Sequence, residues 1–141
     1  MKFAKWVYII AGIYGLLVVT PLYFSEAQIG RDYPPAITHP EFFYGFVGIT
    51  VAWQLAFLLI GRDPVRYRPL MPVTWVEKFS FAIAALVLNT QGRMTSIFFA
   101  AAMIDLLLGV LFVIAFWRTS EQSAQRSDAS GKLANELLRQ A

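Results

Sequence analysis

Four long runs of apolar residues limit how this chain can fold more than any other feature. They are separated by short polar segments and cover Trp6–Ser25, Phe42–Gly61, Met71–Gln91 and Met94–Trp117. The first two contain no charged residue, and the other two contain only Glu77, Lys78 and Asp105. A helix that crosses about 30 Å of hydrocarbon needs about 20 mostly apolar residues, because each residue adds about 1.5 Å. The sequence therefore predicts an all-α fold, an integral membrane four-helix bundle.

The composition excludes several other classes of protein. Hydrophobic residues make up 57% of the chain and charged residues 15%, which is more apolar area than a soluble domain of 141 residues could enclose. The net charge of +3 lies at the ends of the apolar runs rather than in a basic stripe, so we expect no nucleic acid as a partner. Because the chain has no cysteine and His39 is its single histidine, we expect no metal site, catalytic triad or cofactor.

The apolar runs define one expected domain, a four-helix transmembrane unit over residues 1–118. Its helices are expected at about residues 5–24, 41–61, 72–91 and 95–117. The first run is longer than the usual core of a secretory signal, about 7–15 residues, so we interpret it as a membrane helix. Thr38 and Thr74 each precede a glutamate by three residues, which predicts capping boxes at the second and third helices. Three prolines and Gly30 predict an irregular loop at residues 25–39.

The distribution of lysine and arginine predicts the orientation in the membrane. If the N-terminus is cytoplasmic, the segments on the opposite side hold only Arg31 and Arg93. The segments on the cytoplasmic side then hold nine such residues, namely Lys2, Lys5, Arg62, Arg66, Arg68, Arg118, Arg126, Lys132 and Arg139. Since positive residues remain on the cytoplasmic side, both termini are expected there. Residues 119–141 are expected to form a polar cytoplasmic tail, with a short amphipathic helix at residues 132–141.

Asp105 is the first candidate for a functional residue. A carboxylate at the centre of a bilayer costs about 2.5–3.5 kcal/mol on insertion scales, so it should face protein or water. Ala101 and Gly109 lie one turn away on either side, and their small size allows the first or third helix to approach closely. Asp105 would then bind a polar group of a ligand or relay a proton. The structural alternative is an interhelical hydrogen bond, for which Tyr14 is a candidate partner.

A second group of polar residues lies in the cytoplasmic halves of the second and third helices. Gln54, Glu77 and Lys78 are expected to line a polar pocket that opens toward the cytoplasm, with Asp105 at its floor. Two alternatives are structural: Glu77 completes the capping box of Thr74, and Lys78 extends to the membrane surface. No catalytic role is assigned to the candidate ligand-binding residues, which are Asp105, Glu77, Gln54, Tyr14 and Lys78.

Rows of small residues predict seams where helices pack closely. One row on the second helix consists of Gly48, Ala52 and Ala56, and a shorter row on the first helix consists of Ala11 and Gly15.

The turn at residues 62–69 contains two prolines and several charges, which predicts an ordered and structural turn at the membrane surface. Asp63 is expected to pair with groups of the turn itself.

Several short motifs between Glu41 and Arg118 are distinctive in combination. They are Tyr44-Gly45-Phe46, Trp53-Gln54, Asp63-Pro64-Val65-Arg66-Tyr67-Arg68-Pro69, Glu77-Lys78 and Asp105-Leu106-Leu107-Leu108-Gly109. Together they resemble small bacterial four-helix inner-membrane proteins of unassigned function. The four-helix plan with acids inside the membrane is also remotely similar to the DoxX-type and EXPERA-type bundles. The resemblance implies the fold and a multi-pass protein of the bacterial inner membrane, and it brings no catalytic motif.

The sequence supports two hypotheses from different classes of protein. In the first, the protein is non-enzymatic and holds a small lipophilic ligand, or a partner membrane protein, against the inward polar cluster. In the second, it is a proton-coupled carrier of a small molecule or a membrane enzyme that modifies a lipid, with Asp105 or Glu77 as acid or base. An enzyme needs two or more positioned titratable groups, and the candidates here are few and at different depths, which favours the first hypothesis.

Overall fold

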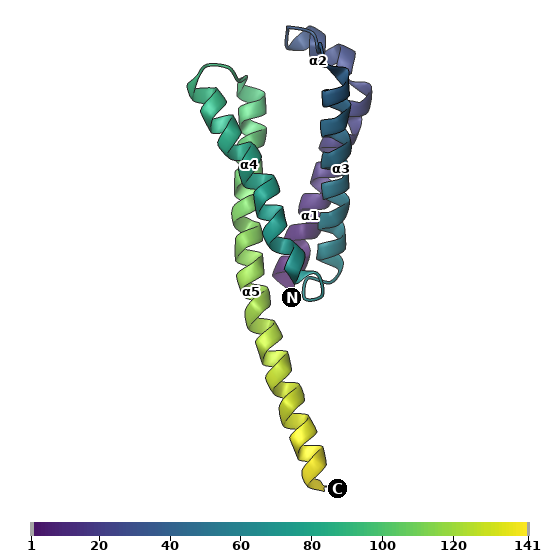
Figure 1. Ribbon diagram of the computed structural model, residues 1–141, viewed down its shortest axis with the longest axis vertical. Helices are drawn as coiled ribbons and strands as arrows, with labels where there is room; N and C mark the ends of the chain where they lie inside the picture. Colours follow the sequence, from purple (N-terminus) through teal and green to yellow (C-terminus); the bar gives the residue numbers. More distant parts are fainter. Residues whose placement is uncertain (1, 141) are drawn as a thin grey trace.

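The computed structural model describes the backbone of residues 2–140 and the side chains of residues 2–119. Within these residues the chain is all-helical and has no strand (Figure 1). The elements in chain order are α1 Lys2–Val19, the short 3-10 helix η1 Thr20–Phe24, α2 Glu26–Asp32, α3 Pro40–Arg62, the 3-10 helix η2 Arg68–Leu70, α4 Met71–Thr90 and α5 Ser96–Gln140. The expected amphipathic helix at residues 132–141 lies beyond the side chains that the structure describes.

Among the described residues, four helical segments are long and apolar enough to cross a membrane, namely Lys2–Phe24, Pro40–Arg62, Arg68–Thr90 and Ser96–Thr119. The first three agree with the predicted helices to within about four residues, because charged and turn-forming residues end each apolar run. The fourth was predicted to end at about residue 117, whereas the backbone of α5 continues as helix to Gln140. Only 17% to 28% of the residues in the most apolar window of each segment are buried inside the protein. Most of the apolar surface of these helices therefore points away from the other helices.

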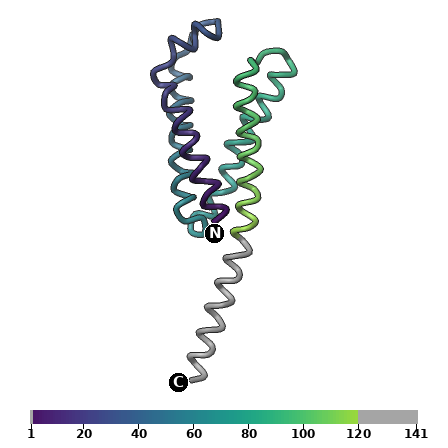
Figure 2. Tube along the Cα trace, turned by 180° about the vertical axis from the view of Figure 1, so that it is seen from behind, coloured from purple at the N-terminus to yellow at the C-terminus, as the bar shows by residue number. Residues whose placement is uncertain are grey.

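The four long helices form two pairs that meet at one end of the molecule and diverge at the other. Helix α1 packs along α3, α4 packs along α5, and α1 also contacts α5. Figures 1 and 2 both show the resulting V, with the N-terminus and the turn between α3 and α4 at the closed end. Helix α2 and the turn between α4 and α5 lie at the open end. We call the two pairs the α1–α3 arm and the α4–α5 arm.

The buried core lies at the closed end and joins the two arms. The ring of Tyr8 on α1 stacks on Phe112 of α5 with ring centroids 4.2 Å apart, and Phe57 of α3 meets Phe112 at 5.0 Å. The Tyr8 hydroxyl shares a hydrogen bond of 3.0 Å with Thr74 Oγ1 on α4. All four residues are fully buried. Since each such ring pair contributes about 0.5–1.5 kcal/mol beyond its burial, this cluster holds the arms together.

Glycines allow α1 and α3 to approach closely within their arm. A Cβ at Gly12 would lie 2.9 Å from the backbone oxygen of Gln54, and a Cβ at Gly15 would overlap the Gln54 side chain. Ala11 is buried as well, which confirms the predicted seam on the first helix. The predicted packing row on α3, Gly48, Ala52 and Ala56, is not formed, because Ala52 is exposed. Helix α3 instead packs on α1 through the face that carries Gln54, Leu58 and Gly61.

The segment expected to be an irregular loop contains a short helix, α2. Gln28 Nε2 donates to both carboxylate oxygens of Asp32, one turn later, at 2.8 and 2.7 Å, and Arg31 Nη2 donates to Gln28 Oε1 at 2.8 Å. Pairs spaced by three or four residues stabilise a helical turn. Here they stabilise helix despite Gly30, so the prediction for this segment is wrong in part.

Neither predicted capping box forms. Helix α3 begins at Pro40, with His39 as its N-cap residue and no hydrogen bond from that side chain to the backbone of the helix. Helix α4 begins at Met71, so Thr74 lies inside the first turn rather than before it. The Thr74 hydroxyl donates to the Met71 carbonyl oxygen at 2.7 Å and turns toward Tyr8 instead.

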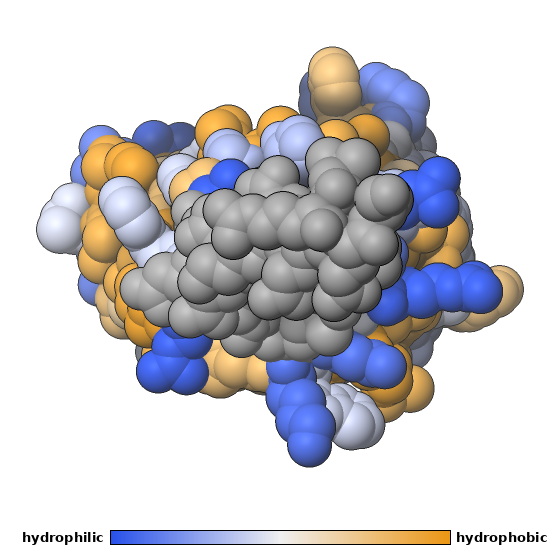
Figure 3. Space-filling view, turned by 90° about the horizontal axis from the view of Figure 1, so that it is seen from below, coloured by the Kyte–Doolittle hydropathy of each residue, from blue (hydrophilic) through white to orange (hydrophobic). Residues whose placement is uncertain are grey.

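The turn between α3 and α4 makes contacts within itself and with α5. Asp63 Oδ1 accepts a hydrogen bond of 3.2 Å from the backbone N–H of Arg66, which confirms that this acid pairs locally. The Arg68 guanidinium lies over the ring of Phe116, 3.8 Å from its centroid, and so attaches the turn to α5. Figure 3, which looks onto this end, shows hydrophilic side chains around its rim. The exposed basic residues of the closed-end segments are Lys2, Lys5, Arg62, Arg66 and Arg118.

Candidate functional site

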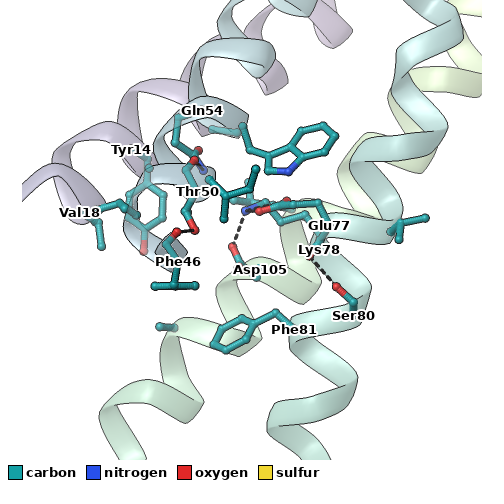
Figure 4. Close-up of a pocket in the computed structure, with 18 of the residues that line it drawn as sticks. Tyr14, Val18, Phe46, Thr50, Gln54, Glu77, Lys78, Ser80, Phe81 and Asp105 are labelled. Carbon is teal, nitrogen blue, oxygen red and sulfur yellow. Dashed lines mark hydrogen bonds and ion pairs between the residues drawn. The ribbon is translucent and has the colours of Figure 1, made fainter. Parts of the chain in front are cut away.

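A cavity of about 680 Å³ lies between the two arms (Figure 4). Helices α1, α3, α4 and α5 all contribute to its wall, which consists mainly of aliphatic and aromatic side chains. Every one of these helices supplies an aromatic ring, and together the rings are Tyr14, Phe46, Trp53, Phe81 and Phe98. The cavity exists because the core fills only the closed end of the V and leaves the space between the diverging arms unfilled.

Three charged side chains form one ion cluster in the cavity wall, which we call the Glu77–Lys78–Asp105 cluster. Lys78 Nζ lies 2.9 Å from Asp105 Oδ1 and 3.4 and 3.3 Å from the two carboxylate oxygens of Glu77. The exposed fraction of the side chain is 4% for Lys78, 16% for Glu77 and 23% for Asp105. The ammonium is therefore enclosed, and the carboxylate of Asp105 is the most accessible of the three groups.

Close contact between α4 and α5 brings this cluster together. A Cβ at Gly109 would lie 2.9 Å from the ring of Phe79 and 3.2 Å from Lys78 Cβ, so a larger residue at this position would have to displace these side chains of α4. Asp105, one turn earlier on α5, can then reach Lys78. Asp105 was expected to face the first or third membrane helix, and this ion pair directs it to the third, α4. Ala101, the other small residue near Asp105, lines the cavity instead of a seam.

Both structural alternatives for the charged pair on α4 are wrong. Lys78 does not extend to the surface, because its ammonium is held by two carboxylates and lies 5.2 Å from the centroid of the Phe57 ring. Glu77 does not close a capping box with Thr74, because α4 begins three residues earlier and the Glu77 carboxylate turns toward Lys78. One oxygen of that carboxylate, Oε2, is buried and accepts no hydrogen bond within the described residues.

The other two candidate residues lie on the α1–α3 side of the cavity, as Figure 4 shows. Gln54 is 2% exposed, and its Nε2 donates to the backbone oxygen of Thr50 at 3.1 Å. Tyr14 is 37% exposed and faces the cavity. Asp105 takes its hydrogen bond from Lys78 rather than from Tyr14, so the candidate pairing of Tyr14 with Asp105 is not formed.

The direction of the predicted pocket is also wrong. The pocket was expected to open at the end that carries the N-terminus and the turn at residues 62–69, with Asp105 at its floor. The aromatic core closes that end, and the arms diverge toward α2 (Figure 1). Since Lys78 is more enclosed than Asp105, the floor of the cavity is formed by Lys78, and Asp105 lies between it and the open space.

Sequence reasoning did not identify the aromatic wall of the cavity. Phe46, Phe81 and Phe98 look like any other apolar residue of a membrane run. The one sequence feature that pointed to this wall is Trp53. Tryptophan in membrane helices is concentrated near the ends of spans, and Trp53 lies deep in its apolar run. In the structure it lines the cavity next to Gln54.

The fold and the cavity define an all-helical protein with four candidate membrane-spanning helices and an apolar cavity that contains one ion cluster. Comparison with families, with curated proteins and with solved structures gave no match to this chain.

Proposed function

We propose that this chain is an integral membrane protein that binds a small lipophilic ligand in the cavity between its arms, without converting it. The supporting observation is the contrast within the cavity, where the walls are apolar and the charge is confined to the Glu77–Lys78–Asp105 cluster. Small-molecule sites are mostly apolar, contain a few placed polar groups and measure about 300–1,000 Å³. The volume of about 680 Å³ falls within that range.

The proposal includes a location in the bacterial inner membrane with both termini in the cytoplasm. Its support is the set of exposed basic residues in the closed-end segments, since such residues remain on the cytoplasmic side. In this orientation the cavity opens toward the opposite side of the membrane. A lipophilic ligand then enters from the lipid or from the outer face, and the core separates it from the cytoplasm.

A proton-coupled carrier or a lipid-modifying enzyme would have to use the same three charged groups. Lys78 Nζ lies within 3.4 Å of both carboxylates, so the three charged groups lie together at one place in the cavity wall and not on opposite sides of a substrate position. Acid–base catalysis needs groups in distinct roles around a substrate position. The geometry therefore favours binding over conversion.

The experiment compares two matched alanines on α5. Both are exposed, but Ala101 lines the cavity and Ala100 does not. Equilibrium dialysis of the neutral fluorophore N-phenyl-1-naphthylamine against protein in lipid nanodiscs, corrected with empty nanodiscs, measures binding. We expect Ala101→Phe to place a ring in the cavity, reduce the space for a ligand and weaken binding by about tenfold or more, while Ala100→Phe binds like wild type. Equal binding by both variants, or no binding by wild type, would contradict the proposal.

A further inference from the structure

The charged groups that line the cavity do not balance one another. They comprise two carboxylates, Glu77 and Asp105, and one ammonium, Lys78, among the described residues of the wall. With all three ionised, the cluster carries one excess negative charge. An uncompensated charge in apolar surroundings is costly, so the ionised cluster favours a cation that can reach it, either a proton or the cationic group of a ligand.

The accessible part of the cluster is its negative part. The Lys78 side chain is 4% exposed and already faces both acids, so an anionic ligand has no approach to its ammonium. The Asp105 side chain is 23% exposed, and only its Oδ1 takes part in a hydrogen bond within the described residues. Asp105 Oδ2 therefore remains free to accept a cationic group of a ligand, and Figure 4 shows this residue between the two arms.

The walls around Asp105 fit a cation that has apolar arms. Tyr14, Phe46, Trp53, Phe81 and Phe98 surround the cavity from four helices. The face of an aromatic ring attracts a cation electrostatically, and the same face packs against hydrocarbon. A hydrated inorganic cation would gain little from such walls, whereas a quaternary ammonium or phosphonium ion uses both properties.

We propose that the cavity binds a monovalent lipophilic cation, with the charged centre next to Asp105 and the apolar arms on the aromatic wall. This inference rests on the proposed function and adds the chemical class of the ligand. It predicts that the protein discriminates between ligands of the same shape and opposite charge.

The test uses tetraphenylphosphonium and tetraphenylborate, which have nearly the same shape and opposite charge, in the dialysis assay with nanodiscs of zwitterionic lipid. We expect saturable binding of the phosphonium and none of the borate. Asp105→Asn should weaken phosphonium binding by about tenfold or more, because it removes the Coulombic attraction of the excess charge and keeps the side-chain shape. The matched control is Glu41→Gln, which removes one negative charge from an exposed residue outside the cavity and should leave phosphonium binding unchanged.

Binding of neutral N-phenyl-1-naphthylamine separates the possible failures. If Asp105→Asn binds the neutral probe like wild type and loses the phosphonium, the inference is supported and the variant is folded. If wild type binds the neutral probe but does not distinguish phosphonium from borate, the cation inference fails and the proposed function stands. If none of the three probes binds, both fail.

Discussion

Lys78 shows how strongly the surroundings of one residue depend on the whole fold. In an extended chain it is one of twelve basic residues, and in the structure it is the buried centre of a cluster that joins α4 to α5. The burial of the Lys78 ammonium is tolerated because of its two carboxylate partners. A buried ion pair offsets the lost hydration only while each charge has an opposite neighbour. Removing one member is therefore more damaging than removing a pair.

At this residue scale, we expect Lys78→Met to destabilise the protein by about 3–5 kcal/mol, because Glu77 and Asp105 then face each other without a cation. Thermal unfolding followed by circular dichroism in one detergent would measure the effect. Adding Asp105→Asn to Lys78→Met should restore part of the loss. Lys5→Met, which removes an exposed lysine, serves as the control and should unfold like wild type. Equal unfolding temperatures for Lys78→Met and wild type would show that the cluster does not stabilise the fold.

At the scale of elements, the contact between α1 and α3 depends on positions without side chains. Gly12 faces the backbone of α3, which cannot move aside as a flexible side chain can. Gly45, in contrast, has nothing within 4 Å of the place where its Cβ would lie. The two glycines are both inside long helices, so they form a matched pair for the cost of close approach.

We expect Gly12→Ala to destabilise the protein by about 1–3 kcal/mol, because the added methyl group forces α1 away from α3. Gly45→Ala should be neutral or stabilising by up to about 1 kcal/mol, because alanine favours helix more than glycine does. The same unfolding measurement compares the two. If both variants gain stability, the close approach of the two helices at Gly12 is not required.

At this scale, features set by local sequence could be predicted, and features set by long-range packing could not. The helical spans could be predicted because the length of an apolar run is a local property. That Asp105 faces the first or third membrane helix was predicted from its small neighbours and the cost of an acid in lipid, but its pairing with Lys78 of α4 rather than with Tyr14 of α1 was not. The burial of Lys78 could not be predicted, because the sequence does not say which face of α4 meets α5. Helix α2 was missed because the prolines and Gly30 predict irregular backbone, whereas the Gln28–Asp32 hydrogen bonds stabilise a helical turn in the structure.

At the scale of the whole molecule, the two arms and their single core were beyond sequence reasoning. Four amphipathic or apolar helices can pair in several ways, and the choice of α1 with α3 and α4 with α5 depends on contacts such as that between Tyr8 and Phe112. The direction of the cavity follows from that choice, which is why the predicted pocket faced the wrong end.

Orientation is testable on the intact molecule, because the chain has no cysteine of its own. We expect Arg31→Cys, in the segment at the open end, to react with a membrane-impermeant maleimide in intact spheroplasts, while Arg66→Cys, at the closed end, reacts only after the membrane is permeabilised. Both positions are exposed in the structure, so accessibility depends on the side of the membrane alone. Labelling of Arg66→Cys but not Arg31→Cys in intact spheroplasts would reverse the topology.

Because the aromatic core lies at one end of the V, a rotation of an arm at the core moves the far end of that arm the most. Thr74, which bonds Tyr8, lies sixteen residues before the end of α4 at Thr90, a length of about 24 Å at about 1.5 Å per residue. A rotation of about 10° at the core therefore displaces the far end of the arm by about 4 Å over that helical length. A small shift of the Tyr8 or Phe112 ring would therefore change the separation of the two arms at the open end by several times as much. Such a shift would occur far from any molecule held between the arms.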